Sequence, residues 1–198
     1  MKIVHAIAAA AALLTGTPTF AADTVIDFEG VASFSPVGDF YAPVGVTFSD
    51  SALALSNDEL GPYFSNAPTP GTVMFAPDVA ATMTFAEGFF GQVAFSYSSA
   101  LAFDSVTIFS DLDGGGTQLA TFALTANAQL GCSDTAFCNW DRVSLSFDGV
   151  GKSIVFGSNG GFVGYDNVTI TAVPEPSTVI LLSLGLSGIA LARRRKSS

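Results

Sequence analysis

The chain has 198 residues, a formal net charge of −10 and 49% hydrophobic residues. The charge is unevenly placed, because residues 23–172 hold sixteen acids against two cations, Arg142 and Lys152, for a net charge of −14. We expect no nucleic-acid partner, since neutralising phosphates requires clustered Lys or Arg. The acidic surface either keeps the protein in solution or binds cations, and composition leaves both interpretations open.

Residues 1–22 have the pattern of a secretory signal peptide. One Lys precedes an apolar stretch at 6–14, a Thr-Gly-Thr-Pro break follows, and small residues offer a cleavage site after Ala21 or Ala22. The remaining body, residues 23–172, is long enough for one domain with a hydrophobic core and short for two.

The body shows the alternation of β-strands. Apolar residues recur two positions apart in several runs, and no helical periodicity is present. These runs are Val93, Phe95 and Tyr97; Val106 and Ile108; Val143, Leu145 and Phe147; and Val168 and Ile170. Turn-rich stretches separate them at 67–71, 111–116, 148–151 and 158–161. About nine to eleven short strands at this spacing predict an all-β fold, a two-sheet β-sandwich or jelly roll.

Residues 24–30 (TVIDFEG) and 164–170 (GYDNVTI) loosely resemble the first and last strands of carbohydrate-binding-type jelly rolls. The resemblance implies that the two strands pair and that nearby acids hold a structural calcium ion. Asp27, Glu29 and Asp166 are then the candidate ligands, since calcium takes roughly six to eight oxygens from carboxylates and carbonyls. The alternative is that these acids lie on edge strands, face water and hinder aggregation.

Residues 111–114 (DLDG) invite comparison with a calcium loop, because acids alternate before a glycine. An EF-hand-like loop that starts at Asp111 would need an oxygen ligand and a glutamate where Gly115 and Phe122 stand. We expect a flexible hairpin connection instead.

Cys132 and Cys138 are predicted to form a disulfide, because an exported chain meets an oxidising environment. Metal or redox use is the weaker alternative, since the spacing is C-x5-C and not C-x-x-C. The body contains no histidine, so it offers no Ser-His-Asp or Cys-His nucleophile, and we expect no enzyme. Trp140 and the tyrosines have faces that stack on sugars, although one tryptophan in a small β domain is more often core.

The end of the chain has three parts. Pro174, Glu175 and Pro176 form an extended segment, residues 177–192 carry no charge, and a basic cluster follows. As a helix, the uncharged run spans roughly 24 Å, slightly less than a hydrocarbon core of about 30 Å. The positive-inside rule leaves the cations in the cytoplasm and the body outside the inner membrane. These cations are Arg193, Arg194, Arg195 and Lys196.

In this order, residues 173–198 resemble the PEP-CTERM sorting signal of Gram-negative bacteria. The resemblance implies processing near Pro174, Glu175 and Pro176 by an exosortase-type membrane enzyme, after transient anchoring in the inner membrane. It also implies delivery to the outer surface or the extracellular matrix. A single-pass anchor that is never cleaved is the alternative.

Three functional hypotheses follow. The first is an exosortase-sorted cell-surface or matrix protein with a non-catalytic structural or adhesive domain. The second is a calcium-organised module that binds exopolysaccharide. The third is a glycoside hydrolase, which needs only two carboxylates.

Overall fold

The computed structural model describes residues 23–173, which form an all-β structure of nine strands and three short 3₁₀ turns. Within this range there is no helix long and apolar enough to cross a membrane. The predicted signal peptide, the Pro-Glu-Pro motif at 174–176, the helix at 177–192 and the cations at 193–196 lie outside the described residues.

The strands follow one another with three 3₁₀ turns in their connections, which are longest before β2, β4 and β8. They are β1 (Asp23–Ile26), β2 (Val46–Phe48), β3 (Leu53–Ser56), β4 (Thr72–Phe75), β5 (Ala81–Ser99), β6 (Ser105–Phe109), β7 (Gln118–Ala123), β8 (Asp141–Phe156) and β9 (Val163–Ala172). The turns are η1 (Ala42–Val44), η2 (Leu112–Gly114) and η3 (Asn159–Gly161).

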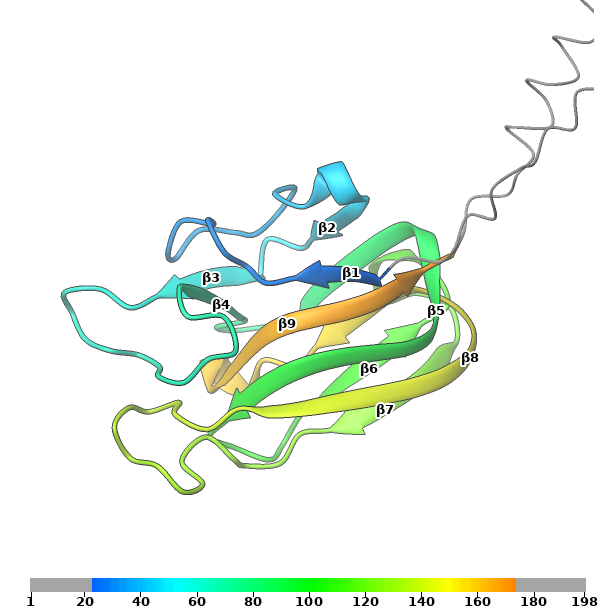
Figure 1. Ribbon diagram of the computed structural model, residues 1–198. Coiled ribbons are helices and arrows are strands. Elements are labelled where there is room, and N and C mark those ends of the chain that lie inside the picture. Colours follow the sequence, from blue (N-terminus) through cyan, green and yellow to red (C-terminus); the bar gives the residue numbers. More distant parts are fainter. Residues whose placement is uncertain (1–22, 174–198) are drawn as a thin grey trace, which may run out of the picture.

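Two layers are joined by the long strands β5 and β8, which pair with each other from end to end. In one layer, β2 and β6 flank the start of β5 and the end of β8, and β7 pairs with β6. In the other, β9 pairs with the later part of β5, and β1 and β4 pair with β9. Figure 1 shows β5 and β8 bending from one layer into the other. The predicted two-sheet β-sandwich is confirmed, as is the pairing of the first and last strands.

Glycines form the corner at which both long strands bend. Gly88 of β5 and Gly149 of β8 have φ of 85° and 92°, and the β5–β8 register shifts between Thr84 and Phe89. Strands change sheets at such bulges, where only glycine adopts positive φ without strain. Residues 148–151, interpreted from the sequence as a turn between strands, instead continue β8 around this corner.

Aromatic side chains fill the space between the layers. Phe95 has no exposed surface and lies with its ring centroid 6.0 to 6.3 Å from those of four other aromatic residues. These are Tyr97, Phe122, Phe156 and Tyr165. Most meet edge to face, the arrangement that the ring quadrupole favours. The core therefore draws on both layers.

The acidic 111–116 loop connects β6 to β7, which pair as the sequence predicts. It folds over the sheet, where Gly114 N donates to Ser153 Oγ at 2.9 Å and Thr84 Oγ1 donates to Asp113 Oδ1 at 3.0 Å. The Asp113 carboxylate therefore attaches the loop to β5, and main-chain groups attach it to β8.

The corner gives a matched pair of glycine substitutions. A Cβ on Gly88 would lie 2.5 Å from Val150 Cγ1, whereas Gly91, which also has positive φ, has open space around that position. We predict that Gly91→Ala lowers the free energy of unfolding by about 1–2 kcal/mol, because alanine is strained in the left-handed conformation. Gly88→Ala adds a steric term and costs about 2–4 kcal/mol. Urea unfolding of both variants checks this, and equal losses would contradict the proposed contact at the corner.

Candidate functional site

The three acids proposed from the sequence as calcium ligands meet one loop, residues 67–71, between β3 and β4. Asp166 of β9 has no exposed surface, although it carries a carboxylate. Its Oδ2 accepts a hydrogen bond from Thr69 N at 2.8 Å, and its Oδ1 accepts one from Asn167 N at 2.7 Å. The buried carboxylate thus ties the loop to the sheet.

The hydroxyl of Thr69 lies in a cluster of oxygens. It is 2.7 and 2.8 Å from the two carboxylate oxygens of Asp166 and 3.2 Å from the carbonyl oxygen of Asp27. A hydroxyl donates one hydrogen, so three acceptor oxygens share one proton. The cluster is rich in oxygen and short of donors, which is the chemistry that a hard cation such as calcium requires.

The other two carboxylates hold backbone donors. Glu29 Oε1 accepts from Gly71 N at 2.8 Å and from Thr72 N at 3.1 Å, and a Cβ on Gly71 would collide with this carboxylate. Asp27 Oδ1 accepts from Tyr41 Oη at 3.0 Å. The carboxylates of Asp27 and Glu29 therefore fix the loop and its surroundings. The groups gathered at Thr69 are the main-chain carbonyl of Asp27 and the carboxylate of Asp166.

A different trio meets a purely geometric criterion for metal binding. Over residues 23–173, the trio of His, Cys, Asp or Glu side chains whose ligand atoms lie within 4.8 Å of one another is Cys132, Asp134 and Cys138. The two sulfurs are joined in a disulfide, as predicted, so no thiolate is available to a metal. The oxygen cluster at Thr69 thus offers a hard cation more available ligand atoms than this trio does.

Burial raises the pKa of Asp166 to about 6. Hydrogen bonds from Thr69 and Asn167 lower this pKa, and the negative charge of Glu29 raises it further. Desolvation outweighs the hydrogen bonds because the ionised carboxylate loses more solvation than three donors return. Near neutral pH the site therefore holds a poorly solvated negative charge, which a bound cation would stabilise.

A second candidate site is a hollow of about 300 Å³ on the outer face of β3, β4 and β9. Its walls are almost entirely apolar and include six aromatic residues: Phe34, Tyr63, Phe64, Phe75, Phe137 and Trp140. Phe34 is 52% exposed and meets Tyr63 and Phe75 edge to face, with ring centroids 5.9 and 6.2 Å away. Concave, aromatic-lined surfaces of this size are typical of small-ligand sites.

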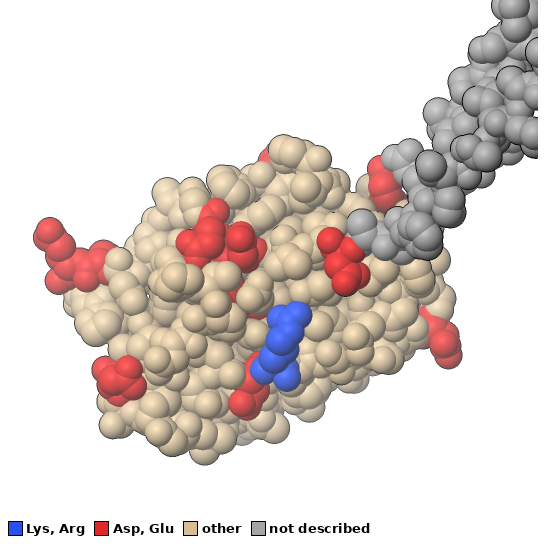
Figure 2. Space-filling view, in the orientation of Figure 1, with Lys and Arg blue, Asp and Glu red and all other residues tan. Residues whose placement is uncertain are grey.

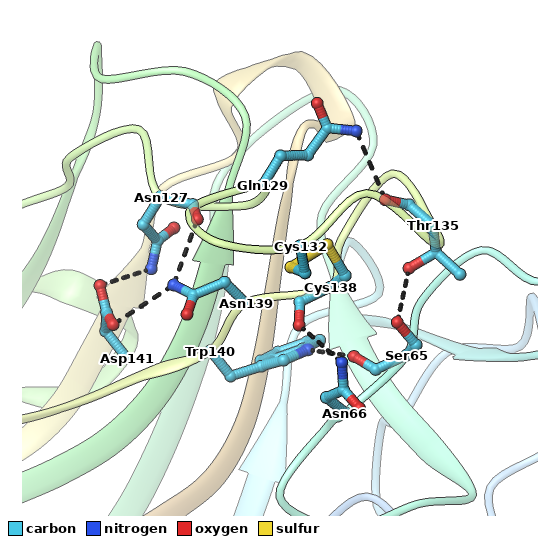
Figure 3. Close-up of a disulfide and its surroundings, with 10 residues drawn as sticks. All are labelled: Ser65, Asn66, Asn127, Gln129, Cys132, Thr135, Cys138, Asn139, Trp140 and Asp141. Carbon is cyan, nitrogen blue, oxygen red and sulfur yellow. Dashed lines mark hydrogen bonds between the residues drawn. A yellow bond between two sulfur atoms is a disulfide. The ribbon is translucent and has the colours of Figure 1, made fainter.

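The disulfide loop shapes one wall of this hollow. Figure 3 shows the indole of Trp140 below the loop, with Nε1 donating to Ser65 O at 3.0 Å. Asn66 Nδ2 donates to Cys138 O at 3.1 Å, which ties the loop to the segment before β4. A Cβ on Gly164 would come within 2.9 Å of the indole, so this glycine of β9 makes room for Trp140.

A wider hollow of about 490 Å³ lies on the other side of Phe137. Asn127 forms part of its wall and is fixed by hydrogen bonds to Ser99 N at 2.7 Å and Asp141 Oδ2 at 2.9 Å. Leu130 and Phe162 also line it and are 64% and 52% exposed. The end of the sandwich that carries the disulfide loop is therefore apolar and concave.

Sequence reasoning missed several residues that build these sites. Thr69 lies in a Pro-Thr-Pro-Gly stretch that indicates only a turn, and its hydroxyl gains a role when β9 brings Asp166 beside it. The sequence indicates stacking faces at Trp140 and Tyr63, but the phenylalanines at 34, 64, 75 and 137 look like ordinary core residues in a strand pattern. Only the fold brings them together.

Comparison with known proteins finds a match at the end of the chain. Residues 172–196 match the PEP-CTERM protein-sorting motif. This chain carries that sorting motif. It indicates an exported protein with a C-terminal sorting signal and confirms the resemblance of the tail. No curated protein matches the sequence.

Among solved structures, the K2 cleaved adhesin domain of Lys-gingipain is similar, with a TM-score of 0.51 at 14% identity. The similarity covers 77% of this chain and 99% of that domain, and it supports the β-sandwich fold. The CsCBM6-3 module from Clostridium stercorarium, solved with cellobiose, is similar at 16% identity over 76% of this chain and 94% of that one, with a TM-score of 0.42. The C-terminal CBM6 of LamC from Zobellia galactanivorans is similar at 16% identity over 76% of this chain and 99% of that one, with a TM-score of 0.40.

The raised pKa of Asp166 predicts a dependence of stability on pH in buffer free of divalent cations. The folded value is about 6 and the model-peptide value is 3.8, so between these pH values the folded state holds more protons than the unfolded state. The contribution is therefore complete below about pH 4 and is lost as pH rises through 6. We expect the free energy of unfolding to fall over this window.

Urea unfolding from pH 4 to 7 measures this effect. Asp166→Asn should remove this part of the pH dependence, because an amide does not titrate. Asp39→Asn, at an exposed acid, is the matched control and should retain it. An unchanged pH profile in Asp166→Asn would contradict the account.

Proposed function

We propose that the protein is an exosortase-sorted cell-surface or extracellular-matrix protein whose β-sandwich is a non-catalytic structural or adhesive domain. The observation that carries the proposal is the sorting motif at residues 172–196, which begins at the last residue of β9. In this proposal an exosortase-type enzyme processes the chain near Glu175 after its export through the inner membrane.

The arrangement of the sandwich supports presentation of its apolar end. Figure 1 shows the start of β1 and the end of β9 at one end of the domain and the disulfide loop at the other. β9 has ten residues, and at roughly 3.3 Å per residue it spans about 33 Å. Val163, at the start of β9, lines the aromatic hollow. The hollows therefore lie far from the point where the sorting motif begins.

The chemistry of the described residues supports a non-catalytic role. Residues 23–173 contain no histidine, and both of their cysteines are in the disulfide. Asp27, Glu29 and Asp166 accept hydrogen bonds from the main chain, from Thr69 or from Tyr41. No observation favours the glycoside hydrolase, and we do not propose it.

Replacing Pro174, Glu175 and Pro176 together by alanine tests the sorting step. We predict that this variant accumulates in the inner membrane at its unprocessed mass, whereas the wild-type protein reaches the outer surface or the matrix. Cell fractionation with mass spectrometry measures both properties. Ser197→Ala, beyond the basic cluster, is the control and should be sorted normally. The wild-type distribution and mass in the triple variant would overturn the proposal.

A calcium-organised glycan-binding module is the second candidate, and the aromatic hollow is the observation that favours it. Exposed aromatic faces stack on sugar rings, and Phe34 of the hollow is 52% exposed and lies edge to face with Tyr63. The oxygen cluster at Thr69 lies in the loop that leads into β4, which forms part of the floor of the hollow. A cation held there by Asp27, Thr69 and Asp166 would keep this loop in place.

Co-sedimentation of the purified protein with the producing cell's exopolysaccharide, in calcium and in chelator, tests this candidate. We expect retention in calcium only, and its loss in Phe34→Ala and in Asp166→Asn. Phe103→Ala is the matched control, because Phe103 is 86% exposed and is not among the residues that line the hollow. Retention of Phe34→Ala at the wild-type level would exclude the hollow as the glycan site.

A further inference from the structure

The aromatic hollow offers a ligand flat apolar faces and few hydrogen-bonding groups. Among the residues that line it, none is charged. The ring centroids of Phe34 and Tyr63 lie 5.9 Å apart and those of Phe64 and Trp140 6.2 Å apart. The indole Nε1 of Trp140 already donates to Ser65 O. A neutral ligand is oriented by well-placed polar groups in the pocket wall, and this wall supplies few of them.

Phe34 is placed at the hollow against the preference of its backbone. Its φ is 57°, in the left-handed region, where a bulky residue is strained. A hydrogen bond of 2.7 Å from Phe34 N to Ala54 O fixes this conformation. Because the side chain is 52% exposed, packing offsets only part of the strain. Strained residues cluster at ligand-binding positions, which supports a binding role for this ring.

One acid lies beside the hollow in the connection between β3 and β4. Asn57 Oδ1 accepts from Tyr63 N at 2.9 Å and from Phe64 N at 3.2 Å, which closes the connection and holds both aromatic residues in the wall. Asp58 is exposed and lies close to Tyr63. Burial, and after it the charge of Asp58, raise the pKa of the Tyr63 hydroxyl. The wall at Tyr63 therefore lies in a negative field.

A second acid reaches the same wall from the disulfide loop. Ser65 N donates to Phe137 O at 3.0 Å, which joins the two segments. Asp134 is exposed, and a hydrogen bond from the Ser65 side chain lowers the pKa of its carboxyl group. Its carboxylate is therefore ionised near neutral pH and lies beside the residue that follows Phe64 of the wall.

The charge of the whole domain adds to these two acids. Residues 23–172 have a net charge of −14, with Arg142 and Lys152 as their cations. Arg142 donates to Asn167 O and Thr169 Oγ1, both at 2.9 Å and on β9, and does not line the hollow. Figure 1 shows the β3–β4 connection and the disulfide loop at one end of the domain. Figure 2, in the same orientation, shows acidic groups at that end and the basic group farther along the sandwich.

We infer that the aromatic hollow binds a glycan that carries free amino groups, with a protonated amino sugar as the unit that enters it. The apolar face of a sugar ring stacks on an aromatic ring, and an ammonium group is attracted to the faces of Trp, Tyr and Phe. Asp58 and Asp134 supply the opposite charge at the rim. The inference rests on the glycan-binding role proposed above as the second candidate and names the class of glycan.

Other charged polymers match this end of the domain less well. An anionic polysaccharide is repelled by a net charge of −14. A cationic peptide matches the charge, but peptides are bound along a strand edge or a long groove. A hollow of about 300 Å³ is at the small end of the range for ligand sites, which suits a sugar unit.

Calorimetric titration of the purified full-length protein with two matched oligosaccharides tests the inference. One is a glucosamine hexamer with free amino groups, and the other is the N-acetylglucosamine hexamer, which has no charge. At about pH 6, in calcium and low salt, the amines are protonated. We expect the amino hexamer to bind roughly tenfold more tightly, since cation–π contacts and weak ion pairs add together. Raising the salt from about 50 to about 500 mM should reduce this preference severalfold.

Three variants separate charge from stacking. Asp58→Asn/Asp134→Asn should lower the affinity for the amino hexamer severalfold and leave that for the N-acetyl hexamer unchanged. Phe34→Ala should weaken both. Asp148→Asn is the matched control, because Asp148 is an exposed acid at the corner, where Phe89 pairs with Ala172, at the end opposite the hollow. It should bind both hexamers like the wild-type protein.

The outcomes distinguish this inference from the glycan-binding role itself. Equal or tighter binding of the N-acetyl hexamer would overturn the inference and leave the glycan-binding role in place. Unchanged binding of the amino hexamer to Phe34→Ala would show attraction to the acidic surface alone, and equally tight binding of a lysine hexapeptide would show a peptide site. Either result overturns the inference. If neither hexamer binds, the inference also fails, and co-sedimentation with the exopolysaccharide decides separately whether the domain binds glycans.

Discussion

The continuous pairing of β5 with β8 is the constraint on which the rest of the structure depends. Because both strands run through the corner, one hydrogen-bonded ladder fixes the two layers relative to each other. A Cβ on Gly151 would come within 2.7 Å of the Phe89 ring, so the strands approach closely where they bend. Within the described residues, the start of β8 is hydrogen-bonded to β5 alone, because β6 pairs with β8 only beyond the corner.

The tie between β9 and the loop before β4 is the second organising feature. A buried carboxylate is unfavourable unless hydrogen bonds or a cation compensate for its lost solvation. At Asp166 the compensation comes from Thr69 N, the Thr69 hydroxyl and Asn167 N, while the carbonyl of Asp27 competes for the hydroxyl hydrogen. Burial therefore explains why the pKa of Asp166 is raised although donors reach its carboxylate.

Much of the fold could be predicted from the alternation of apolar residues. The patterns at Phe95, Ile108, Leu145 and Ile170 all lie within observed strands, because inward-facing residues in a sandwich must alternate with outward ones. The corner could not be predicted, since Asp-Gly-Val-Gly at 148–151 has the composition of a turn and of a bulge alike.

The candidate sites were less accessible to sequence reasoning. Asp27, Glu29 and Asp166 were identified from their resemblance to jelly-roll strands, and they do meet at one loop. Their separate tasks follow from contacts made across 42 to 97 positions of sequence, such as those of Thr69 with Asp27 and Asp166 and of Glu29 with Gly71. The hollow likewise needs the disulfide loop over β4 and β9 before its aromatic residues share a surface.

Exposure of the sandwich outside the cell is the central claim, and thiol labelling of intact cells tests it most directly. Phe103 is 86% exposed, and Cys132 and Cys138 are joined in a disulfide. Phe103→Cys therefore gives residues 23–173 a single free, exposed thiol. A membrane-impermeant maleimide should label this variant on intact cells, and should leave the wild-type protein unlabelled. Labelling that appears only after the cells are lysed would contradict the account.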